Sequence, residues 1–117
     1  MREEGIVSYL LASSRSSGAR FLTTSLVEIG PGGEQRLHSH EPEQVYFILE
    51  GIGQMTVGAE VAPVGPGDCV FIASGQPHGL QNEAGGPLMY FSAAAPTFSP
   101  EQLAQFWPLN SEAEDDA

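Results

Sequence analysis

Glycine and proline divide this chain into short segments along its whole length, and this feature limits the fold more than any other. The 117 residues include 14 glycines and 9 prolines, and no stretch before residue 99 has the apolar spacing of a helix. Both residues favour tight turns, and the segments between them are short and apolar. Many short strands separated by turn signals favour an all-β fold, either a sandwich or a closed barrel.

The apolar segments between the turns are the expected strands. Turn signals such as GPGG at 30–33 and VGPGD at 64–68 separate them. We predict strands over residues 6–12, 21–29, 34–38, 44–49, 53–57, 69–72, 78–82 and 88–93.

A single short helix is expected over about residues 100–107. Ser99 is a suitable N-cap, Pro100 fits the first helical position, and Gln102 has the spacing of a capping-box partner. The apolar residues of this segment share one helical face: Leu103, Phe106 and Trp107.

Length and composition favour one folded domain. Hydrophobic residues make up 41% of the chain and charged residues only 16%, so the chain is able to bury a core. We place that domain at residues 1–110, because a chain of this size has no room for a second core. The last segment, 111–117, is small and acidic and is expected to be disordered.

The charge balance argues against several kinds of partner. The formal net charge is −11, and all four basic residues are arginines. Without lysine, neither Schiff-base chemistry nor a lysine-held phosphate is available. An acidic chain lacks the basic face that nucleic acids and anionic membranes require, so we expect neither as a partner.

The sequence carries no sign of export or of a disulfide framework. No run approaches the roughly 18 apolar residues of a membrane span, and the first residues lack a basic segment before an apolar one. We therefore expect a cytoplasmic protein. Cys69 is the only cysteine, and we expect it to be a small buried residue within a strand.

The three histidines form a pattern typical of a metal site. His38 and His40 alternate in an expected strand, so their side chains project to one face, and antiparallel pairing would bring His78 across from them. Gln44 continues the same alternation. Alternatively, Pro42 interrupts the strand and Glu43 takes the place of Gln44. Such a set of ligands suits a divalent first-row metal that keeps open positions.

The spacing of these residues resembles the two motifs of the cupin superfamily, over about residues 20–95. The first motif, at 32–51, is carried by Gly32, His38, His40, Gln44 and Gly51, with glutamine in the usual glutamate position. The second motif, at 67–82, has alanine in the usual proline position and is carried by Gly67, Ala73, Gly75, His78 and Asn82.

The resemblance implies a fold and a cofactor. The fold is a double-stranded β-helix, or jelly-roll barrel, with the short helix at its C-terminal end. The cofactor is one divalent transition metal per chain (Mn, Fe, Ni, Cu or Zn), held by His38, His40, Gln44 and His78. Because an amide oxygen is neutral, Gln44 would leave the full charge on the metal.

The resemblance also implies a choice between two functions. The favoured one is a metalloenzyme of the dioxygenase, isomerase or lyase type, acting on a small oxygenated organic substrate. The candidate catalytic residues are Arg36 and Tyr46, with Glu43 as a base if it does not bind the metal. Arg36 either points into the cavity with His38 or lies exposed at the rim. The alternative function is a non-catalytic domain that binds or senses a metal or small ligand.

Both faces of the segment 44–49 are apolar. Tyr46 and Ile48 lie on one face, and the other face carries Val45, Phe47 and Leu49. The second face therefore needs a cover, which a second sheet, the terminal helix or another subunit would supply. Since cupins commonly dimerise through sheets, we expect a homodimer.

Overall fold

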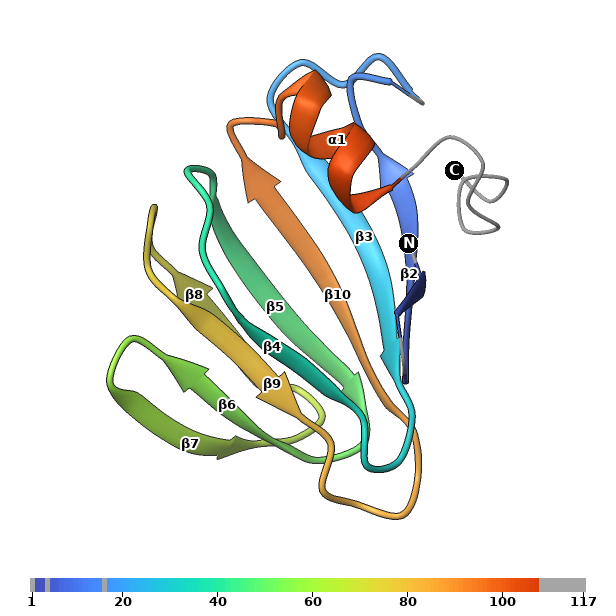
Figure 1. Cartoon of the computed structure of the whole chain (residues 1–117), viewed down its shortest axis with the longest axis vertical. Helices are drawn as coiled ribbons and strands as arrows, with labels where there is room; N and C mark the ends of the chain where they lie inside the picture. The colour runs from blue at the N-terminus through green and yellow to red at the C-terminus, as the bar shows by residue number, and fades with distance from the viewer. Residues whose placement is uncertain (1, 4, 16, 108–117) are drawn as a thin grey trace.

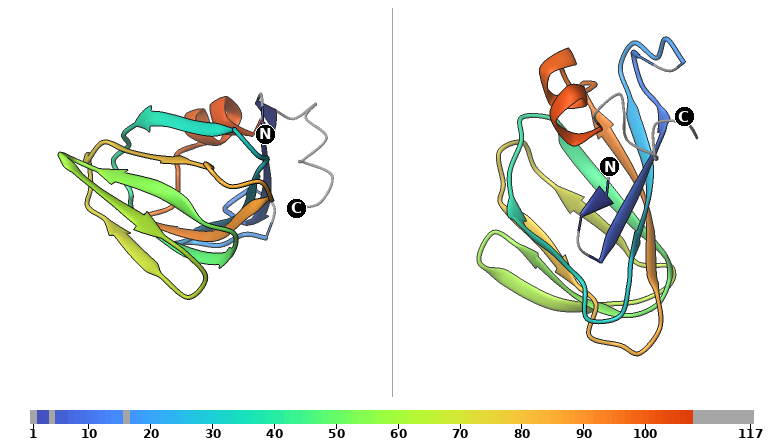
Figure 2. Two further views of the ribbon diagram at one scale, coloured as in Figure 1. Left: turned by 90° about the horizontal axis from the view of Figure 1, so that it is seen from below. Right: turned by 45° about the vertical axis from the view of Figure 1, so that its right-hand side comes forward.

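Two antiparallel sheets packed face to face make up most of the molecule in the computed structural model (Figure 1). The structure describes residues 2–3, 5–15 and 17–107, and the expected acidic tail at 111–117 lies outside these ranges. Further views show how the two sheets face each other (Figure 2). The predicted all-β fold with a short C-terminal helix is confirmed.

The larger sheet has six strands in the order β1-β2-β3-β10-β5-β8, and the smaller has four in the order β4-β9-β6-β7. The strands of the larger sheet are β1 (Arg2–Glu3), β2 (Ile6–Ala12), β3 (Thr23–Ile29), β5 (Glu43–Glu50), β8 (Cys69–Ile72) and β10 (Leu88–Ala95). Those of the smaller sheet are β4 (Glu34–His38), β6 (Gly53–Val57), β7 (Glu60–Val64) and β9 (His78–Gln81).

The main core lies between the two sheets. Alternate residues of β3 and β10 are buried, as expected for strands with one face toward an apolar interior. Residues from both sheets meet in this core, including Ile29, Ile48, Ile72, Leu80 and Leu88. Side-chain alternation on antiparallel strands therefore decides which residues reach the interior.

Helix α1 (Pro100–Phe106) covers one end of the sandwich, beside β2 and β10 (Figure 1). Its N-cap is Ser99, and the predicted capping box with Gln102 is present. Leu103 and Trp107 are buried in a second, smaller core. The Trp107 indole N–H also donates a hydrogen bond of 3.3 Å to the Ser8 hydroxyl on β2. No helix in the described part of the chain has the length and apolar character needed to cross a membrane.

Most strands lie where the sequence predicts them, but the sequence predicts neither β1 nor β7. Pro63 lies within β7, and proline is more typical of a connection than of a strand. Since β7 is an edge strand of the smaller sheet, the absent N–H of Pro63 is tolerated there. The sequence did not predict this strand because it contains a proline, which is tolerated here since β7 pairs with a neighbour on only one side.

The outer face of the larger sheet is apolar and is not covered by any described element. Cross-strand pairing aligns Tyr9, Leu26, Phe91, Phe47 and Cys69 in one row across five strands. The prediction that Cys69 is buried is wrong, because it lies on this face of the edge strand β8 and is exposed. The exposed fraction is 40% for Phe47, 46% for Leu49 and 58% for Phe71.

Candidate metal site

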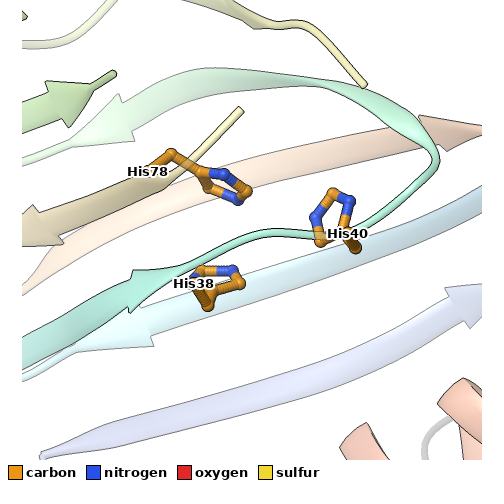
Figure 3. Close-up of side chains that lie close together, drawn as sticks. All are labelled: His38, His40 and His78. Carbon is orange, nitrogen blue, oxygen red and sulfur yellow. The ribbon is translucent and has the colours of Figure 1, made fainter. Parts of the chain in front are cut away.

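The three histidines meet at one end of the space between the sheets (Figure 3). His38 ends β4, His78 begins β9, and the strand register pairs them directly. Their ring centroids lie 4.2 Å apart, and the ring of His40 lies 4.9 Å from that of His78. One nitrogen from each ring lies within 4.8 Å of the other two. The predicted convergence of the histidines is therefore confirmed.

His40 reaches the cluster from a connection and not from the strand that the sequence predicted. It follows β4 by two residues, in the segment that leads to β5. The Gly75 N–H donates a hydrogen bond of 2.8 Å to the His40 carbonyl, which ties this segment to the turn before β9. Gly75 has a φ of 76°, a conformation that glycine adopts without strain. The two sequence motifs thus contact each other at this hydrogen bond.

Backbone carbonyls fix the orientation of all three imidazoles. In each ring, Nδ1 lies within hydrogen-bonding distance of a carbonyl oxygen, which accepts a proton and does not donate one. The three pairs are His38 with Arg36 (2.9 Å), His40 with Pro42 (2.8 Å) and His78 with Gln76 (2.9 Å). A neutral ring with its proton on Nδ1 presents the Nε2 lone pair, and metal-binding histidines are commonly oriented in this way.

The Nε2 atom of His78 is buried and makes no hydrogen bond within the described part of the chain. Burial lowers the pKa of His78 to about 4, and the charges of the neighbouring His38 and His40 act in the same direction. The ring is therefore neutral near pH 7, and its Nε2 carries a lone pair with no donor to satisfy it. A buried lone pair that faces two other imidazoles fits a metal ion.

Gln44 joins the cluster, whereas Glu43 does not. Gln44 is 8% exposed, and its Oε1 lies 2.9 Å from the Nε2 of His40. The Gln44 amide nitrogen donates to the Ser92 hydroxyl, which orients the amide oxygen toward His40. Two atoms with lone pairs face each other favourably only when a proton or a cation lies between them. Glu43 lies on the opposite, exposed face of β5.

Arg36 lies outside the cavity because β4 is irregular. The pairing of β4 with β9 shifts register between Gln35 and His38, so that simple alternation fails there. Gly79 on β9 accommodates this bulge, since a Cβ at that position would lie 2.8 Å from the Gln35 carbonyl oxygen. Gln35 consequently points inward, and Arg36 is exposed. Of the two orientations open to Arg36, the structure shows the one at the rim.

Two stacked tyrosines lie next to the histidines. The rings of Tyr46 and Tyr90 are 4.1 Å apart and nearly parallel, and Tyr46 also contacts the ring of His78. Tyr46 donates a hydrogen bond of 2.8 Å to the Gln35 amide oxygen, and the Gln35 amide nitrogen donates one of 2.8 Å to Tyr90. Burial raises the pKa of Tyr90 to about 12 and that of Tyr46 well above its usual value. Both phenols stay protonated near neutral pH, which argues against Tyr46 as a base.

A cavity of about 60 Å³ adjoins the histidines. His38, His40 and Gln44 form one part of its wall, and buried serines of the larger sheet form another: Ser8, Ser25 and Ser92. Aromatic side chains at the C-terminal end of the fold complete the lining: Phe98, Phe106 and Trp107. No aspartate, glutamate, lysine or arginine of the described chain lines this cavity.

Sequence reasoning missed Gln35, Ser25, Ser92 and Phe98 as parts of the site. One signal for the two serines was available, because both occupy positions whose alternation places them on an inward face, where apolar residues are usual. Gln35 gave no such signal, since a bulge is needed to turn it inward. Asn82, from the second motif, has a structural role: its amide nitrogen donates to the carbonyls of Ile29 and Gly86.

Comparison with known proteins agrees with this geometry. The cupin domain family matches residues 25–93, which is more than half of the chain. The chain belongs to the cupin family. The structure of TT1209 from Thermus thermophilus is similar to this cupin, with a TM-score of 0.71 and 30% sequence identity over 81% of this chain and 87% of that one.

Two curated relatives of this cupin have described functions. It is 31% identical to an oxalate-binding protein of Thermotoga maritima over 67 residues, or 56% of this chain and 55% of that protein. It is 26% identical to the dimethylsulfoniopropionate lyase DddW of Ruegeria pomeroyi over 88 residues, or 75% of this chain and 58% of that protein. This cupin thus spans a little over half the length of each relative.

Proposed function

We propose that this cupin binds one divalent transition metal through His38, His40, His78 and Gln44, and that the loaded protein is an enzyme. The observation that carries the proposal is the set of three imidazoles, each with Nδ1 held by a carbonyl and with one ring nitrogen within 4.8 Å of the other two. The unpaired Nε2 of His78 supports it further, because a buried polar atom without a partner is costly unless a ligand satisfies it.

The proposed substrate is a small oxygenated organic molecule. When bound, a metal such as Mn, Fe, Ni, Cu or Zn supplies Lewis-acid chemistry, and a redox-active one also supplies electron transfer. Around it, Gln35 holds the hydroxyls of Tyr46 and Tyr90 in place. Phe98, Phe106 and Trp107 limit the access of water from the end covered by α1. The similarity to a dimethylsulfoniopropionate lyase supports the lyase class over a dioxygenase or an isomerase.

A non-catalytic binding domain is the second candidate, and a specific observation favours it. The described cavity wall carries no carboxylate, and its two tyrosines are protonated, so no side chain there is an obvious general base. Glu43, the other candidate base, is exposed on the far side of β5. The similarity to an oxalate-binding protein agrees with this candidate.

Elemental analysis of protein purified without a metal-affinity tag tests the metal site. We expect about one divalent ion per chain, as for a single site of this kind. Negligible metal, together with no rise in thermal stability on adding Mn²⁺, Fe²⁺, Ni²⁺, Cu²⁺ or Zn²⁺, would show that the assignment is wrong.

Turnover by the loaded protein separates the two functions. The panel contains dimethylsulfoniopropionate, oxalate, diketones, flavonoids and uronates, incubated in air. Oxygen uptake, a change in ultraviolet absorbance or a new product identifies an enzyme. Binding in calorimetry without any product identifies a binding domain.

We also propose that this cupin forms a homodimer through the outer face of its larger sheet. A row of apolar side chains crosses five strands there, and Phe47, Leu49 and Phe71 are exposed on the same face. A gently twisted sheet face is complementary to a second copy of itself, and two such faces pack in β-sandwiches about 10 Å apart.

A further inference from the structure

We infer that Gln44 determines the charge of the ligand that this site accepts, and that the site takes a small oxyanion in preference to a neutral molecule. This inference rests on the proposed metal site and names the ligand class for it. It concerns Gln44 as a specificity-determining residue, because glutamine and glutamate are similar in shape but differ by one unit of charge.

The described wall of the cavity carries no charged side chain. The four proposed metal ligands are three imidazoles and one amide, and the remaining polar lining consists of serine, tyrosine and glutamine side chains. The two charged candidates from the sequence, Arg36 and Glu43, are both exposed and do not line the cavity. A divalent ion at this site would therefore keep its whole charge, with no counter-charge on the described wall.

Burial makes an uncompensated charge costly at this site. His40, Gln44 and His78 are each less than 9% exposed, so water gives little screening there. A net charge in a poorly solvated site is costly, and an anionic ligand removes that cost while a neutral ligand does not. One additional negative charge within bonding distance changes the affinity for an anion by well over tenfold at the dielectric constants typical of such sites, about 20. Glutamate at position 44 would place that charge on the protein, and glutamine leaves the charge to the ligand.

The cavity and its serine hydroxyl suit a compact ligand that accepts hydrogen bonds. The cavity of about 60 Å³ holds only a few non-hydrogen atoms, since one water needs roughly 10–15 Å³ of such volume. It shares Gln35, His38 and Phe106 with a cleft of about 710 Å³. The Ser25 hydroxyl lines this cavity, is 5% exposed and makes no hydrogen bond to another described residue. It lies directly across the strand pair from Ser92. A compact carboxylate would bind the metal and accept a hydrogen bond from Ser25.

The test compares oxalate with its neutral analogue oxamide on manganese-loaded protein. Isothermal titration calorimetry gives both affinities for the wild type and for Gln44→Glu. We expect Gln44→Glu to bind oxalate at least tenfold more weakly than the wild type. The affinity for oxamide should differ between the wild type and Gln44→Glu by about twofold or less, because oxamide carries no charge. Metal content is measured for each sample before and after titration.

Further variants separate an effect of charge in the cavity from a loss of metal. Ser25→Asp puts a carboxylate into the cavity without altering a proposed metal ligand, and Ser25→Asn is its neutral match, since both lack the serine hydroxyl. Ser25→Asp should bind oxalate more weakly than Ser25→Asn even if Gln44→Glu loses its metal. Arg36→Ala removes a cation that lies outside the cavity, on the wall of the adjoining cleft, and should lower oxalate affinity less than the acidic variants do. Equal oxalate affinities in the wild type and the acidic variants, or a large loss in Arg36→Ala, would overturn the inference. A metal-free wild type would instead overturn the proposed function.

Discussion

The two faces of strand β5 place unlike chemistry one residue apart. Gln44 and Tyr46 point into the interior, where they contact histidine, serine and glutamine side chains. Phe47 and Leu49 point outward and are substantially exposed. Near the site, the inner face is polar and the outer face is apolar, which reverses the usual pattern of a half-buried strand. The difference agrees with the two proposals made above, a ligand site on the inner face and association through the outer face.

The inner face tolerates its polar residues because nearly all of them bond to one another. Gln35 links the two tyrosines, Gln44 bonds to Ser92, and carbonyls accept from the histidines. Satisfied networks of this kind offset most of the desolvation of their members. The Nε2 of His78 and the hydroxyl of Ser25 are left over, and both adjoin the proposed ligand position.

The largest expected effect is the loss of metal when a histidine of the inner face is removed. His78→Ala removes one of three imidazoles. We expect the metal content to fall from about one ion per chain to below about a tenth of that, because a site built on three imidazoles loses most of its metal affinity when one of them is removed. Elemental analysis after dialysis measures the loss, and circular dichroism checks that the fold is retained. Full metal content in this variant would place the metal elsewhere.

A charge on the outer face should affect association and leave the metal in place. Phe47→Asp puts a carboxylate in the middle of the apolar row, where burying it against a second copy is unfavourable. We expect light scattering after size exclusion to give the mass of two chains for the wild type and of one chain for the variant. Metal content should be the same in both. A wild type with the mass of a single chain would contradict the proposed dimer.

A comparison of neighbouring residues on β5 sharpens the contrast between inside and outside. Gln44→Ala removes the amide oxygen beside His40 and should weaken metal binding by about tenfold, whereas Glu43→Ala on the exposed face should change it by less than about twofold. Competition with a fluorescent chelator measures both affinities. The reverse order would show that Glu43 is the ligand and that the strand is rearranged when metal binds.

The smallest expected effect concerns the tyrosines of the inner face at high pH. Burial raises the pKa of Tyr90 to about 12, above the value near 10 of an unfolded chain. The folded state therefore binds this proton more tightly, so that its contribution to stability is present below about pH 10 and is lost as the pH rises to about 12. The Tm of the wild type should fall more steeply over this window than that of Tyr90→Phe. Parallel curves for the two proteins would contradict the shift.

The sequence predicts this fold and its histidine cluster well because both depend on local signals. The capping box of Ser99 and Gln102, and the two spaced motifs around His38 and His78, need no knowledge of tertiary contacts. Alternation also placed Gln44 correctly along the regular strand β5. These predictions succeed wherever the backbone keeps the period that the side chains imply.

The remaining predictions failed or stayed open where tertiary structure overrides that period. The orientation of Arg36 depends on a bulge in β4, and that of Cys69 on whether another element covers its side of the sheet. The sequence did not predict β7, because a proline such as Pro63 is acceptable only in a strand at the edge of a sheet. Each case needs the identity of a neighbouring strand, which a single sequence does not contain.

The bulge opposite Gly79 determines which side chain of β4 faces the candidate site, and hence the charge of its wall. In a regular β4, alternation from His38 would turn Arg36 toward the ligand and Gln35 toward solvent, and the wall would gain a fixed positive charge. The bulge that Gly79 accommodates thus places an amide, and not a guanidinium, at this part of the wall. In a cupin with the same β4 residues and a side chain at the position of Gly79, the Cβ would lie 2.8 Å from the Gln35 carbonyl oxygen, so the backbone of β4 would have to shift.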